Sequence, residues 1–137
     1  METYGFHFRY RLCGAPPTIR EFVFKDTETL TAGDLVNLES GLADLAATND
    51  TGLVGAAVET LSGTTNVTKI KVIVDADAVY AVTDANARTM GTQFDISGTT
   101  GAMTITTDSN HDVVVAANST ATEPTLVMII QGEHPLF

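Results

Sequence analysis

The sequence has little of what several classes of protein require. It has no tryptophan and one cysteine, Cys13, so neither an intramolecular disulfide nor a cluster of metal-binding thiolates can form. No apolar run reaches the length of a membrane-spanning helix. Only 7 of the 137 residues are Lys or Arg, against 17 Asp and Glu. The net charge of −10 would repel nucleic-acid phosphates, so we expect no direct nucleic-acid partner and no membrane partner.

The few basic residues are unevenly distributed. Residues 1–25 hold four of them against two acids, whereas the rest of the chain holds three against fifteen acids. The beginning of the chain is aromatic and charged, unlike the basic-then-apolar pattern of a cleaved signal peptide. We therefore expect a protein that is made in a cytoplasm.

The sequence between residues 21 and 131 predicts short strands. Threonine, valine and isoleucine favour strands because their branched side chains fit a pleated surface, and turn signals recur at short spacing. The expected strands are 21–25, 35–39, 42–46, 53–61, 68–74, 79–82, 92–96, 103–107, 112–116 and 125–131. The two-residue turn Ser40-Gly41 predicts a hairpin, 84–91 predicts one helical turn, and the apolar segment 125–131 predicts a central strand buried on both faces. The fold class expected is all-β, a compact β-barrel or β-sandwich of short antiparallel strands.

The N-terminal segment YGFHFRYRL alternates between aromatic and basic positions. In an extended chain its aromatic residues share one face, and Arg9 and Arg11 lie on the other. The stiff sequence GAPPT at 14–18 then separates this ribbon from the acidic body. We expect an extended arm over residues 1–20 and a β-barrel or sandwich domain over 21–137, although an ordinary first strand with its aromatic face in the core is the alternative. Tyrosine, phenylalanine and arginine anchor protein interfaces, so the candidate interface residues are Tyr4, Phe6, Phe8, Arg9, Tyr10 and Arg11.

The chain has no Gly-rich phosphate loop, no nucleophile elbow and no histidine pair at a familiar metal-ligand spacing. We expect no enzymatic activity, no cofactor and no metal. The alternative is a metal-assisted hydrolase that uses Asp75, Asp77 and Asp84, since grouped carboxylates can perform acid–base work.

Two stretches of the body resemble head decoration, or capsid cement, proteins of tailed bacteriophages. The first, TLTAGDLVNLESGLADLAATNDTGLVGAAVETLSG (29–63), has a Gly-Asp before apolar residues, a short hairpin, a polar Asp-Thr turn and then small residues. The second, VIVDADAVYAVTDANARTMGTQFDISG (72–98), has an Asp-rich turn before a Gly-Thr strand. The resemblance covers about 29–130 and leaves the N-terminal segment outside it.

This resemblance implies a structural virion protein on the outer surface of the expanded head, made in the host cytoplasm. Such a protein cross-links neighbouring major capsid proteins against the pressure of packaged DNA, commonly as a homotrimer. The implied partners are the major capsid protein and further copies of the chain itself. The alternative is a phage tail, baseplate or head-fibre β-protein with an attachment role.

Overall fold

The computed structural model describes residues 4–25, 28–47, 52–63, 68–106 and 112–130. Over these residues the chain forms thirteen strands and no helix. The strands are β1 (His7–Arg11), β2 (Ile19–Val23), β3 (Glu28–Leu30), β4 (Leu35–Glu39), β5 (Leu42–Leu45), β6 (Leu53–Ala56), β7 (Leu61–Gly63), β8 (Lys69–Ile73), β9 (Ala78–Val82), β10 (Gln93–Ser97), β11 (Thr104–Thr106), β12 (Val113–Val115) and β13 (Thr125–Ile129). The paired strands are antiparallel throughout, which confirms the predicted all-β class.

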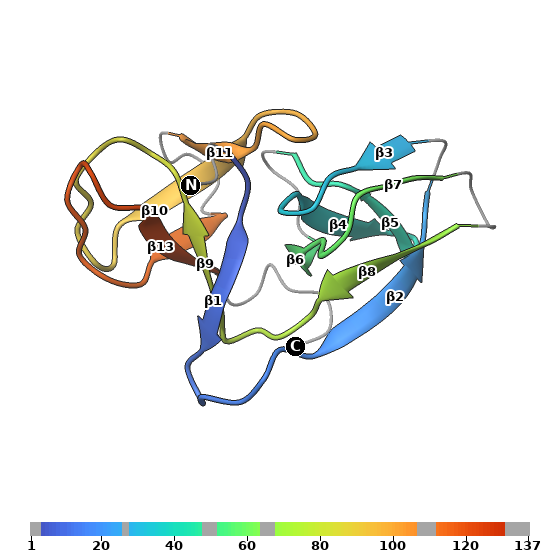
Figure 1. The fold of residues 1–137 in the computed structure, drawn as a ribbon, viewed down its shortest axis with the longest axis horizontal. Helices are drawn as coiled ribbons and strands as arrows, with labels where there is room; N and C mark the ends of the chain where they lie inside the picture. Colours follow the sequence, from blue (N-terminus) through green and yellow to red (C-terminus); the bar gives the residue numbers. More distant parts are fainter. Residues whose placement is uncertain (1–3, 26–27, 48–51, 64–67, 107–111, 131–137) are drawn as a thin grey trace.

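One large sheet faces a group of smaller ones (Figure 1). The large sheet has the strand order β1-β9-β13-β12-β10-β11. The smaller sheets have the orders β5-β4-β6, β2-β8 and β3-β7. The molecule is therefore a compact sandwich, and the barrel alternative is not closed. The edge strands of the large sheet are β1 and β11. The residues just before them are joined by a hydrogen bond of 2.9 Å from the Gly5 N–H to the Met103 carbonyl.

The sheet β5-β4-β6 lies between two hydrophobic cores. Leu35 and Leu53 point toward the first core, which the large sheet lines from the other side with Tyr80 and its neighbours. Val36 and Val54, the next residues in each strand, point toward the second core, among the residues of β2 and β8. Because successive side chains of a strand point to opposite faces, a strand between two cores carries apolar residues on both faces. Strand β6 is accordingly buried over its whole length.

Several local predictions are confirmed. Strands β4 and β5 form the expected hairpin, with Glu39 paired to Leu42 across the turn. Ser40 and Gly41 have φ angles of 53° and 79°, and two positive φ angles are what a type I′ turn requires. The alternation expected in 68–74 is also present, since Ile70, Val72 and Val74 all enter the second core.

Other predictions are wrong. The expected strand 53–61 is two strands, β6 and β7, which pair with different partners. The segment 84–91 contains no helical turn. Within it Ala85 has a φ of 60°, and Arg88 nevertheless forms an ion pair with Asp84, four residues earlier.

Strand β13 is central, as predicted, but it is fully buried on one face only. The large-sheet strand that is buried at every position is its neighbour β9. The apolar sequence of β13 is therefore not explained by burial alone.

Candidate protein-interaction surface

The N-terminal segment is part of the fold. Strand β1 is an edge strand of the large sheet and pairs with β9 (Figure 1). Ahead of it, the Phe6 N–H donates a hydrogen bond of 2.7 Å to the Gly33 carbonyl, and the Phe6 side chain is 1% exposed in the first core. The expectation of an arm outside the body is thus corrected over the described residues 4–20. The alternative, a first strand that contributes to the core, agrees with this arrangement.

A β-bulge divides the predicted aromatic face. In the register with β9, Phe8 is opposite Tyr80 and Tyr10 is opposite Val79, so that two steps along β1 match one step along β9. Such an insertion reverses the alternation of the strand that carries it. Phe8 packs against the first core, with its ring edge-on to Tyr80 at 6.4 Å between centroids, whereas Tyr10 is 43% exposed.

Phe6 is therefore a core residue, which contradicts its prediction as an interface residue, and Phe8 is a partly buried residue that packs against the core. No feature of the sequence marks the bulge. Regular alternation of side chains along the strand therefore predicted that all four aromatic residues share one face.

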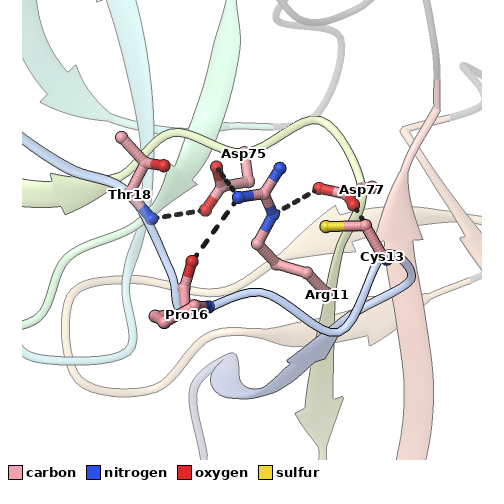
Figure 2. Close-up of polar contacts among 6 residues, drawn as sticks. All are labelled: Arg11, Cys13, Pro16, Thr18, Asp75 and Asp77. Carbon is pink, nitrogen blue, oxygen red and sulfur yellow. Dashed lines mark hydrogen bonds and ion pairs between the residues drawn. The ribbon is translucent and has the colours of Figure 1, made fainter.

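Arg11 forms ion pairs with two carboxylates of its own chain. Its Nε donates a hydrogen bond of 2.8 Å to Asp77 Oδ1, and its Nη1 lies 3.3 Å from Asp75 Oδ1 (Figure 2). The hydrogen bond from Arg11 lowers the pKa of Asp77 below its ordinary value, because it stabilises the ionised carboxylate. The prediction that Arg11 faces a partner protein is thus corrected, since its charge is already neutralised.

The same two carboxylates also hold the loop between β1 and β2. Asp77 Oδ2 accepts a hydrogen bond of 3.3 Å from the Cys13 N–H, and Asp75 Oδ2 accepts one of 2.6 Å from the Thr18 N–H. Figure 2 shows these contacts around the arginine, whose Nη1 also lies 3.5 Å from the Pro16 carbonyl. The β8–β9 connection thereby fastens the stiff Pro-Pro segment, and both connections pass between the large sheet and the smaller ones.

The carboxylates considered for hydrolysis are not brought together as a trio. Asp84 forms a separate ion pair with Arg88. The guanidinium carbon of Arg88 lies over the Phe94 ring, 4.4 Å from its centroid. Over the described residues, no group of three or more His, Cys, Asp or Glu side chains could hold a metal ion. Asp75, Asp77 and Arg11 instead form salt bridges within the chain, which join the β1–β2 loop to the β8–β9 connection.

The Gly-Asp pair of the resembling stretch also has an internal role. Asp34 is 1% exposed, and its carboxylate accepts hydrogen bonds from Thr31 N–H, Thr100 Oγ1 and Gly101 N–H. These contacts join the turn before β4 to the turn before β11. The motif thus contributes to the packing of the sandwich.

Three of the six predicted interface residues face solvent. Tyr4 is 49% exposed, Tyr10 is 43% exposed, and Arg9 is exposed and makes no ion pair with any described residue. Leu12 and Ile19 continue the exposed apolar positions along the same segment. We group these five exposed residues, which are neighbours in the sequence, under the name N-terminal surface. It contains four of the six large hydrophobic side chains that are exposed in the described part of the chain.

Leu12 and Ile19 were not among the sequence candidates. Leu12 shared the alternation of the aromatic residues, and that pattern could have identified it. Ile19 carried no such signal.

No protein-family model and no curated protein matches this chain in the comparisons made. Within the described residues there is no helix with the length and apolar character needed to cross a membrane. A functional conclusion therefore depends on the geometry of the surface and on the resemblance to decoration proteins.

Proposed function

We propose that this chain is a structural virion protein that binds the outer surface of an expanded phage head. It cross-links neighbouring major capsid proteins and so stabilises the shell against the pressure of packaged DNA. The observation that carries the proposal is the N-terminal surface, where exposed aromatic and aliphatic side chains accompany an exposed arginine on an otherwise acidic protein. Tyrosine and arginine side chains are enriched at protein interfaces.

The fold suits a protein that bears load. Two hydrophobic cores share one middle sheet, and the connections between sheets are fastened by Arg11 and by Asp34. A rigid body loses little conformational entropy when it binds, so more of its contact energy remains as affinity. Many copies acting together on one shell need only modest affinity each.

The N-terminal surface also suits a partner with acidic groups. Arg9 would meet carboxylates of the capsid protein, while Tyr4, Leu12 and Ile19 would bury their exposed apolar area. The contribution of an arginine at the rim of an interface is mainly to orientation and association rate.

The test is co-sedimentation with expanded, undecorated heads of the source phage. The triple variant Tyr4→Ser, Leu12→Ser, Ile19→Ser should fold normally, because all three side chains are exposed, and should lose occupancy on the heads. The matched control is Val58→Ser with Met90→Ser, which removes exposed apolar side chains from elsewhere on the surface. Equal occupancy of the triple variant and the control would contradict the role given to the N-terminal surface.

A further inference from the structure

A surface hollow of about 210 Å³ lies beside the bulge of β1. Strand β1 contributes Arg9 to its lining and β13 contributes Leu126. The other lining residues belong to the connection between β12 and β13: Asn118, Ser119, Glu123 and Pro124. An apolar cavity of roughly 150 Å³ can hold a benzene ring, so this hollow has room for a molecule as large as a small amino acid.

The bulge of β1 places a cation at the hollow. Phe8 and Tyr10 each have a partner on β9, and Arg9 between them has none. An inserted residue of this kind is aimed differently from its neighbours, and bulges recur beside functional sites. Arg9 is exposed and forms no ion pair with any residue that the structure describes. Its guanidinium therefore has donors to offer a ligand.

The β12–β13 connection supplies the opposite charge. Glu123 Oε1 accepts a hydrogen bond of 2.9 Å from the Thr120 N–H. This bond lowers the pKa of Glu123, because it stabilises the ionised carboxylate, so the side chain is charged at neutral pH. Arg9 and Glu123 line the same hollow without forming an ion pair with each other. The hollow thus presents one separate charge of each sign.

The wall of the hollow is fixed by hydrogen bonds to the segment before β10. Arg88 and Ser119 exchange two backbone hydrogen bonds of 3.1 and 2.9 Å, and the Met90 N–H donates one of 2.7 Å to Asn118 Oδ1. A wall that is already ordered costs little further entropy when a ligand binds.

Ser119 adds a polar group whose bonding is incomplete. Its hydroxyl oxygen is buried and has no hydrogen-bond partner within the described part of the chain. Buried polar groups nearly always have a partner. Since Ser119 lines the hollow, a rotation of its hydroxyl toward a ligand oxygen would supply one.

We propose that this hollow binds a small zwitterion, a molecule that carries one carboxylate and one ammonium group. The carboxylate binds the Arg9 guanidinium, which can hold it through two parallel hydrogen bonds, and the ammonium group binds Glu123. Pro124 and Leu126 contact the methylene groups between the two charges. A simple anion would be repelled by Glu123 and a simple cation by Arg9, so the hollow favours a ligand that has both charges.

This inference does not depend on the proposed function, because its test uses the purified protein without heads. In the proposed function Arg9 meets a carboxylate of the capsid protein. A bound zwitterion and a head would therefore compete for Arg9.

The test is titration of the ¹⁵N-labelled protein, followed by the NMR signals of the Ser119 and Leu126 amides. The probes are glycine, β-alanine and γ-aminobutyrate, in which the two charges are separated by increasing lengths of chain. At least one of them should shift both signals with a Kd of about 1 mM. Acetate and methylammonium, which carry one charge each, should bind at least about tenfold more weakly.

Two variants test the charges one at a time. Arg9→Gln should weaken binding of the best probe by about tenfold or more, and so should Glu123→Gln, whose amide oxygen can still accept the Thr120 N–H. The matched control Arg20→Gln removes an exposed arginine from β2 and should leave the Kd unchanged.

Three results would overturn the proposal. The first is the absence of any shift at about 50 mM of every probe, far above the expected Kd. The second is acetate that binds as tightly as the best zwitterion, which would show an adventitious anion only. The third is equal weakening of the best probe by Arg9→Gln and Arg20→Gln, which would show an effect of net charge alone.

Discussion

Gly55 in β6 tests how closely the middle sheet and β8 approach each other. A Cβ at this position would lie 1.8 Å from the Ile73 carbonyl oxygen and 2.7 Å from the Tyr80 hydroxyl. The first of these atoms belongs to the backbone of β8 and cannot move away alone. Gly55→Ala therefore requires the two strands to separate at a place where both are buried.

The magnitude is the sum of two contributions. Overpacking a closed core costs about 1–3 kcal/mol. The φ of Gly55, 153°, disfavours a side chain and adds roughly 1–3 kcal/mol. We expect Gly55→Ala to lower the free energy of unfolding by about 4 kcal/mol, a large part of the ~5–15 kcal/mol that stabilises a domain.

The assay is urea unfolding followed by circular dichroism, because the chain has no tryptophan to report by fluorescence. The matched control is Gly41→Ala, where φ is also positive at 79° but a Cβ would meet no atom within 4 Å. The control isolates the backbone cost, about 1–2 kcal/mol. If Gly55→Ala is no more destabilising than Gly41→Ala, the close approach of β6 and β8 is refuted.

Three further predictions concern buried or paired polar groups. Arg11 lowers the pKa of Asp77, so the ion pair stabilises the fold above the unfolded pKa of about 4. This contribution is lost as pH falls through the folded pKa of Asp77. Arg11→Gln should therefore reduce the loss of stability at acid pH, measured by thermal unfolding. Burial raises the pKa of Tyr80, so stability should fall as pH rises above the ordinary tyrosine value of about 10, and Tyr80→Phe should remove that loss in alkaline urea titrations. Asp34→Asn keeps one acceptor oxygen for the three donors that the carboxylate binds, and should cost about 1–3 kcal/mol in urea unfolding; an unchanged midpoint would show that these hydrogen bonds contribute little.

Much of the fold could be predicted from local patterns. The hairpin at Ser40-Gly41 follows from turn chemistry, and the alternation of Ile70, Val72 and Val74 follows from the pleat of a strand. These features depend on residues that are close together in the sequence. The close approach at Gly55 is also local in origin, since a glycine between apolar neighbours leaves room for another backbone.

The composition of the site was less predictable because it depends on contacts distant in the sequence. Arg11 looked free for a partner until the fold placed it against Asp77, 66 residues later. The bulge in β1 divided the aromatic residues, and only the pairing with β9 reveals it. The apolar character of β13 was attributed to burial on both faces, whereas Leu126 and Met128 on its second face are only partly buried. Sequence periodicity shows that a face is apolar, but it does not show what covers that face.

The proposed role in the virion can be tested by one binding measurement. Purified protein is mixed with expanded, undecorated heads of the source phage, and the heads are sedimented and their bound copies counted. Saturable binding at a copy number that matches the lattice three-folds is the predicted result. Absence of binding at micromolar protein, or saturation at a few dozen copies or fewer, would contradict it and would favour a tail, baseplate or fibre protein.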